Sequence, residues 1–187
     1  MILPIVGYGS PMLRKIAQPI DKDYSGLSVL IENMFETMYN AHGVGLAAPQ
    51  IDLSIRLIVI DAEPFIESYP EAEGFKRAFI NPEVLEEYGE KWLFEEGCLS
   101  LPELHEEVSR HSTVLVKYYD ENFNLKEELL TGVRARIFQH EFDHLEGKVF
   151  VDRLSPLRKT LLKRKLNDIS NGKVVTSYKM KRQNTKK

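Results

Sequence analysis

The segment HEFDH at residues 140–144 constrains the fold of this chain more than any other feature. It is an HExxH motif, and the apolar spacing of residues 132–145 predicts a helix around it. Residues four apart on a helix lie on one face, about one turn apart, so both imidazoles can reach the same tetrahedral ion. Glu141 then projects towards a water on that ion. The chain is expected to fold so that this helix face meets a metal.

The motif alone leaves two interpretations open, because HExxH is short enough to recur by chance on a solvated helix face. Val133 and Ile137 lie seven and three residues before His140, so the face leading into the motif is apolar. This favours a buried site, which needs a third ligand.

The third ligand of HExxH peptidases is absent from its usual places. Those enzymes use a later glutamate, or a histidine in HExxHxxGxxH, but Phe150 occupies that position and neither residue type follows Glu146. Asp152 is a weak candidate. Cys98, the only cysteine, is either a small buried hydrophobe or a reactive or ligating thiol. A thiolate with two imidazoles leaves a fourth position open, as catalytic zinc sites do.

Three segments together resemble the signature sequences of the peptide deformylase family: GVGLAAPQ at 43–50, EGCLS at 96–100, and HEFDH. YGSPMLRKIA near the N-terminus and LSPLRKTLL after the motif extend the likeness over most of the first 165 residues. The family removes the formyl group from the N-terminal formylmethionine of nascent polypeptides and releases formate. The resemblance therefore implies a metal-dependent hydrolase with Cys98, His140 and His144 as its ligands.

The resemblance also implies a reaction scheme. The metal lowers the pKa of its bound water to about 7, and the resulting metal-bound hydroxide attacks the formyl carbon. Glu141 takes the proton and returns it to the leaving amine. The side-chain amide of Gln50 and the backbone N–H of Leu99 donate to the oxyanion. Without the resemblance, a hydrogen bond from Gln50 to nearby backbone is the expected role.

Two groups of residues are predicted to bind the substrate. Gly43 and Gly45 flank Val44, and they serve either a tight turn or, as the resemblance implies, close approach of a peptide lying alongside like a strand. Val44, Val133 and Ile137 are predicted to form the pocket for the methionine side chain.

The metal is not fixed by spacing. One cysteine with two histidines suits zinc by ligand type, whereas the resemblance implies one Fe²⁺ ion, with Zn²⁺, Ni²⁺ or Co²⁺ able to occupy the same ligands. The sequence departs from the family at His105, where many bacterial members place a peptide-contacting arginine, and in a longer segment at 62–76.

The predicted fold is α+β, with small antiparallel or mixed sheets packed around the HExxH helix. A single catalytic domain at 1–170 is expected, followed by a basic tail at 171–187 that is partly strand or disordered. Residues 62–77 should be irregular. Helices are predicted near 12–17, 25–42, 132–145 and 156–171, and strands at 56–61, 78–82, 113–120, 124–130 and 174–178.

Charge is distributed unevenly along the chain. Residues 148–187 hold thirteen Lys and Arg against two acids, and the rest holds twelve against twenty-six. The basic end is either a solvated helix with a frayed terminus or a surface for a polyanion such as RNA. A contact with the ribosome would suit an enzyme that acts on nascent chains.

No basic stretch precedes the apolar start MILPIV and no membrane span is present, so a cytoplasmic protein without membrane or DNA partners is expected.

Two rival functions remain. A zinc peptidase that cuts internal peptide bonds would share HExxH but use a ligand other than Cys98. A non-catalytic nucleic-acid-binding module with a structural metal would use the basic tail.

Overall fold

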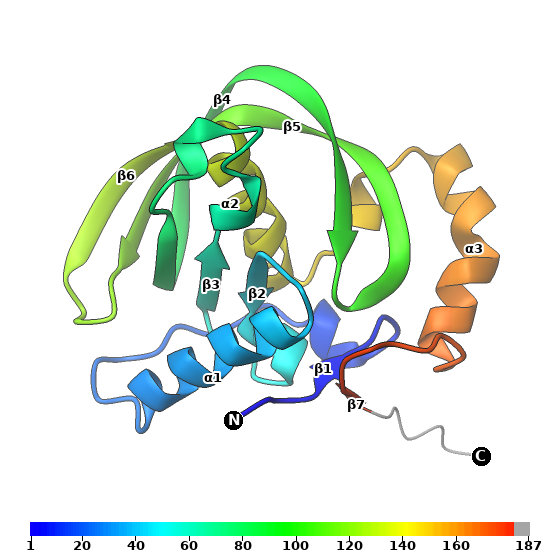
Figure 1. The fold of residues 1–187 in the computed structure, drawn as a ribbon, viewed down its shortest axis with the longest axis horizontal. Helices are drawn as coiled ribbons and strands as arrows, with labels where there is room; N and C mark the ends of the chain where they lie inside the picture. Colours follow the sequence, from blue (N-terminus) through cyan, green and yellow to red (C-terminus); the bar gives the residue numbers. More distant parts are fainter. Residues whose placement is uncertain (182–187) are drawn as a thin grey trace.

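A curved antiparallel sheet surrounds the helix that carries HEFDH in this computed structural model, which describes residues 1–181 (Figure 1). The five strands of the sheet follow the order β2-β3-β4-β5-β6, and α2 packs against them. This arrangement confirms the α+β prediction. The helices are α1 (Leu27–Asn40), α2 (Gly132–Leu145) and α3 (Pro156–Ser170); the strands are β1 (Ile5–Val6), β2 (Gly45–Ala47), β3 (Leu57–Asp61), β4 (Lys76–Cys98), β5 (Leu101–Tyr119), β6 (Leu125–Thr131) and β7 (Met180–Lys181).

The three long helices lie where the sequence predicts them. α1 buries its apolar stripe against β2 and β3. Ser155 is the N-cap residue before α3, and its Oγ accepts the Arg158 N–H at 3.2 Å. The short helix after Ser10 is a 3-10 turn, Pro11–Arg14, that ends earlier than predicted. The Ser10 side chain caps it as expected, at 3.3 Å from the Met12 nitrogen.

Strands β4 and β5 are far longer than predicted, at 23 and 19 residues. Burial along β5 alternates strictly between Leu104 and Arg110, so the period of a strand is present. Two inward positions carry the charged residues Glu106 and Arg110 instead of apolar ones. The hydrophobic pattern therefore missed most of β5. It missed most of β4 because residues 83–95 of that strand are exposed or only partly buried. The turn between them follows Cys98 directly and sets that residue at the end of β4.

The segment at 62–76 is irregular, as predicted, with two 3-10 turns. It is nevertheless anchored, since Ala72 and Phe75 are buried. Glu71 Oε1 accepts the Val133 N–H at 3.2 Å, which places a carboxylate at the N-terminus of α2. This contact satisfies one of the unpaired N–H groups at a helix start, where a negative charge is also favourable.

The two ends of the described chain meet. β7 pairs in parallel with β1, with Ile5 opposite Met180. The predicted strand at 174–178 is wrong: Val175 is 87% exposed, and Thr176 Oγ1 donates a local hydrogen bond to the Tyr178 carbonyl at 2.7 Å.

The structure describes residues 1–181. The disorder predicted for the end of the tail falls on residues 182–187, which lie outside this range. The domain boundary at residue 170 stays a prediction. No helix within residues 1–181 is long and apolar enough to cross a membrane.

Candidate metal centre and cleft

Cys98, His140 and His144 come together as the sequence predicts. One candidate ligand atom from each residue lies within 4.8 Å of the other two, and Cys98 Sγ is 3.3 Å from His144 Nε2. The histidines occupy successive turns of α2, and the cysteine reaches them from the end of β4. His144 is fully buried and His140 nearly so.

Glu96 fixes the orientation of the His140 ring. Its Oε2 lies 2.8 Å from His140 Nδ1, and a carboxylate only accepts hydrogen bonds, so Nδ1 carries the proton. Burial acts to raise the pKa of Glu96, but hydrogen bonds from Arg110 and His140 hold that pKa well below its usual range. The lone pair of His140 Nε2 is therefore left for a metal, the usual effect of a carboxylate behind a ligating histidine.

The donor set fits a divalent cation. Burial would raise the pKa of the Cys98 thiol, but His144 and His140 beside it lower that pKa to about 5, which favours the thiolate. Burial raises the pKa of the Glu141 carboxyl to about 7. Its Oε2 is buried without a hydrogen-bond partner among residues 1–181, unusual for a buried carboxylate oxygen. Three ligands with an unpaired carboxylate beside them match an open, catalytic type of site.

Gln50 makes the expected backbone hydrogen bond and also points towards the cysteine. Its Oε1 accepts the Ala47 N–H at 2.8 Å, which is the hydrogen bond to nearby backbone. Its Nε2 lies 3.3 Å from Ser100 Oγ and 3.5 Å from Cys98 Sγ. The first contact turns the amide nitrogen towards the cysteine.

The glycines at 43 and 45 make room for other side chains of this chain. Neither has a positive φ, and the left-handed residue of this segment is His42, with φ 57°. A Cβ on Gly45 would collide with the Glu141 carboxylate, and one on Gly43 would lie 2.8 Å from Leu99 Cδ1. Larger residues at these positions would displace Glu141 or Leu99.

A cleft of about 460 Å³ opens beside the ligand cluster. Among the residues predicted to bind substrate, Val133 lies instead in the core cluster behind α2, fully buried. The other predicted site residues on the cleft wall are Gly43, Val44, Gly45, Gln50, Cys98, Leu99, Ile137, His140 and Glu141. Further wall residues, for which the sequence predicted no role in the site, include Phe65, Phe94, Leu101, Leu104 and Tyr178; His105, which differs from the family pattern, also lines it.

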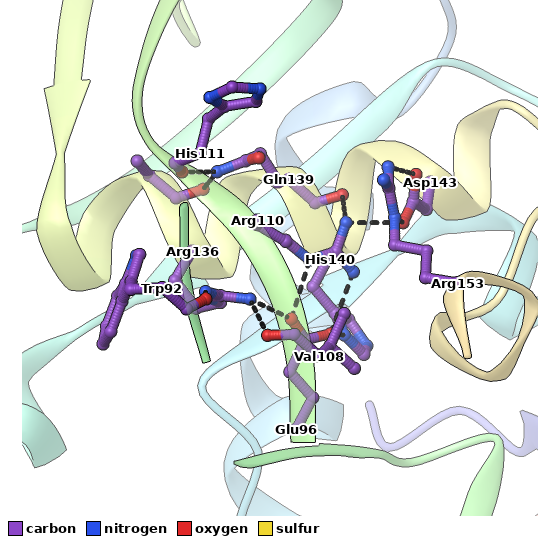
Figure 2. Close-up of polar contacts among 11 residues, drawn as sticks. Trp92, Glu96, Val108, Arg110, His111, Arg136, Gln139, His140, Asp143 and Arg153 are labelled. Atoms are coloured by element: carbon purple, nitrogen blue, oxygen red, sulfur yellow. Dashed lines mark hydrogen bonds and ion pairs between the residues drawn. The ribbon is translucent and has the colours of Figure 1, made fainter. Parts of the chain in front are cut away.

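A chain of buried charges extends from His140 through Glu96 and Arg110 to Asp143 and Arg153 (Figure 2). Arg110, fully buried, bonds Glu96 Oε1 at 2.7 Å and Asp143 Oδ2 at 2.7 Å. Arg153 binds both oxygens of Asp143 at 2.6 Å.

Arg136 supports the same carboxylate from α2. It donates to Glu96 Oε1 at 2.9 Å and to the Trp92 carbonyl at 2.7 Å. Sequence reasoning missed these residues, although Arg136 precedes His140 by four positions and so shares its helix face. Asp152, the weak alternative ligand, bonds Arg14 and the Val149 N–H.

The sequence profile of one family, described as Polypeptide deformylase, matches residues 2–160. The chain belongs to the polypeptide deformylase family. A peptide deformylase of Flavobacterium psychrophilum is 52% identical over 188 residues, with 97% of each chain covered. One from Christiangramia forsetii is 51% identical and covers 100% of this chain and 99% of its own.

Solved structures of the deformylase family have the same fold. The crystal structure of a peptide deformylase from Legionella pneumophila superposes with a TM-score of 0.79 at 40% identity, over 92% of this chain and 98% of that one. These relatives confirm the resemblance inferred from the three signature segments.

Proposed function

We propose that this chain removes the formyl group from the N-terminal formylmethionine of nascent polypeptides by metal-dependent hydrolysis. The observation that carries the proposal is the position of Cys98, whose sulfur joins two imidazoles of α2 within 4.8 Å. The family model and the relatives' names support the same activity. Neighbouring groups of the cleft have the chemistry that formamide hydrolysis needs.

Cys98, His140 and His144 would hold one divalent ion. Bound there, the ion would act as a Lewis acid and make water nucleophilic at neutral pH. We propose Fe²⁺ because of the family resemblance, with Zn²⁺, Ni²⁺ and Co²⁺ as substitutes. Elemental analysis of anaerobically purified protein should find iron, and activity should fall in air and return with Ni²⁺ or Co²⁺. Full activity with zinc alone would contradict iron.

Glu141 would carry the proton. A general acid and base works best with a pKa near the operating pH, and burial raises the pKa of Glu141 to about 7. Its unpaired Oε2 can accept a proton from water and pass it to the amine that leaves the formyl carbon. Gly45 leaves the carboxylate the space that this position requires.

Gln50 and Leu99 would stabilise the oxyanion. The Gln50 carbonyl is held by the Ala47 N–H, so its amide is oriented before substrate arrives. The Leu99 N–H follows the cysteine ligand directly. Such fixed donors typically contribute a factor of about 10²–10³ each to the rate.

The apolar wall of the cleft would accept the methionine side chain. Val44 and Ile137 lie on it together with Phe65 and Phe94, so a long unbranched side chain can be buried beside the ligands. Val133 would support this wall from the core. The peptide backbone would lie along residues 43–45.

Turnover of a formylated methionine dipeptide tests the function. Metal-loaded protein should release formate from formyl-Met-Ala and leave internal bonds of an unformylated peptide intact. Cleavage of internal bonds without formate release would support the peptidase alternative, and binding of RNA without either activity would support the binding module.

We further propose that the enzyme works in the cytoplasm and docks on the ribosome through its basic C-terminal segment. Lys163 and Arg164 are exposed on α3. Nearness to the emerging chain would raise the local substrate concentration.

A further inference from the structure

The segment after α3 returns to the cleft. Residues 173–181, named the C-terminal strap, run from the end of α3 to β1 (Figure 1). The Ile5 N–H donates to the Lys179 carbonyl at 2.8 Å, and Lys181 forms an ion pair with Asp52. Asp52 directly follows the 3-10 turn Ala48–Ile51, which contains Gln50. The strap is therefore fixed to an element of the proposed oxyanion site, although it lies beyond the residues that the family profile matches.

Tyr178 extends from the strap to the cleft wall. Its hydroxyl donates to the Leu99 carbonyl at 2.8 Å, across 79 positions of sequence. Its ring packs in the same apolar cluster as Leu99. Burial and the nearby Cys98 raise the pKa of Tyr178 to about 12, so the hydroxyl stays protonated and remains a donor at neutral pH.

The turn that holds Leu99 is secured from three directions. Gly43 packs against its side chain, where even a Cβ would lie 2.8 Å from Cδ1. The Tyr8 N–H donates to the next carbonyl, that of Ser100, at 2.8 Å. Tyr178 supplies the contact to the Leu99 carbonyl itself. This contact can be removed by replacing Tyr178 with phenylalanine, which lacks the hydroxyl but keeps the shape of the ring.

We propose that Tyr178 is a positioning residue of the active site: by holding the carbonyl of the Leu99–Ser100 peptide it fixes the backbone of Leu99, so that the Leu99 N–H, which belongs to the preceding peptide, stays directed at the oxyanion. This inference rests on the proposed function. It makes the C-terminal strap part of the catalytic unit. A tyrosine that only stabilised the chain end would affect unfolding but not the turnover of each intact site.

Tyr178→Phe removes the hydroxyl and keeps the ring. Tyr119→Phe is the matched control, because Tyr119 packs against the same apolar cluster and its hydroxyl makes no hydrogen bond within residues 1–181. For formyl-Met-Ala-Ser, kcat per bound metal should fall about tenfold in Tyr178→Phe with KM changed less than twofold, a smaller loss than removal of a whole oxyanion donor. The control should match the wild type. An unchanged kcat, or a change in KM alone, would overturn the inference whatever the melting temperature does.

Hydrogen exchange provides a readout that needs no activity. In Tyr178→Phe, amide exchange of a peptide spanning residues 97–101 should be at least several-fold faster than in the wild type and in Tyr119→Phe, measured by mass spectrometry on metal-loaded protein. Unchanged exchange would overturn the positioning role. If the wild type releases no formate, the proposed function fails, and this exchange result still decides whether Tyr178 restrains Leu99.

Discussion

Cys98 shows how much chemistry one side chain can indicate. It is the only thiol in the chain, and its place before the turn at the end of β4 gives it access to both histidines of α2. The sequence predicted Cys98 as a candidate ligand from the lack of Glu and His after Glu146 and from the signature EGCLS. Glu96 and Asp143 lie inside the segments EGCLS and HEFDH, but neither spacing nor periodicity distinguishes a buried carboxylate from an exposed one, so their roles behind the candidate ligands were not predicted.

Cys98→Ser should lose the metal. A serine hydroxyl is not deprotonated at neutral pH and is a poor ligand for Fe²⁺, Zn²⁺, Ni²⁺ or Co²⁺. We expect metal content, measured by mass spectrometry after dialysis, to fall at least tenfold, and formate release to fall with it. Retention of the metal by Cys98→Ser would mean that another residue completes the site.

Glu141→Gln should separate metal binding from catalysis. The amide keeps the shape of the side chain but cannot take a proton, so kcat should fall by about 10²–10⁴. Metal content should match the wild type, because Glu141 is not one of the three clustered ligands. A variant that loses metal and activity together would show that Glu141 acts as a ligand.

At the scale of elements, α2 is a helix with a polar interior face. Arg136, Gln139, His140, Glu141 and Asp143 are all buried on it, and charges from β4 and β5 meet them. Helix periodicity and the HExxH motif predicted this helix correctly. The buried charges Glu106 and Arg110 hid β5, since a period of two is recognised by apolar residues on the inward face, whereas β4 was missed because its residues 83–95 are exposed or only partly buried.

Glu96→Gln tests that network. Without the negative charge of Glu96, the positive charges of Arg110 and Arg136 stay buried with one counter-charge fewer. Breaking a buried ion pair typically lowers the free energy of unfolding by about 3–5 kcal/mol. The His140 Nδ1–H also loses its charged acceptor, so metal affinity should fall about 10–100-fold. Urea unfolding and metal titration measure the two effects. Glu107→Gln, on an exposed position of β5, should change neither; equal affinities in both variants would contradict a role for Glu96 behind His140.

At the scale of the whole molecule, charge separates the C-terminal helix from the rest. The uneven distribution was evident in the sequence, and the structure places its described part largely on the exposed face of α3. The return of the chain to β1 and Leu99 was not evident, because Tyr178 belongs to no motif and contacts a residue 79 positions away. Non-local contacts of single side chains leave no periodic trace in a sequence.

Lys163→Glu combined with Arg164→Glu should weaken ribosome binding. Reversal of exposed positive charges reduces attraction to RNA phosphates, and the effect should be largest at low salt. We expect less co-sedimentation with ribosomes, while turnover of formyl-Met-Ala stays unchanged because α3 lies outside the cleft. Lys22→Glu combined with Lys91→Glu changes the net charge equally, on exposed positions elsewhere. Equal loss of binding in both double variants would mean that net charge alone governs the association.

The carboxylate of Glu71 at the start of α2 gives the surface segment at 62–76 an influence beyond its own position. Val133, whose N–H it accepts, lies seven residues before His140, roughly 10 Å along the helix axis. Insertions or deletions in this segment would withdraw the carboxylate and loosen the first turn of the helix that carries the ligands. Evolution or engineering can therefore vary the length of this excursion only if another acceptor takes over the same amide.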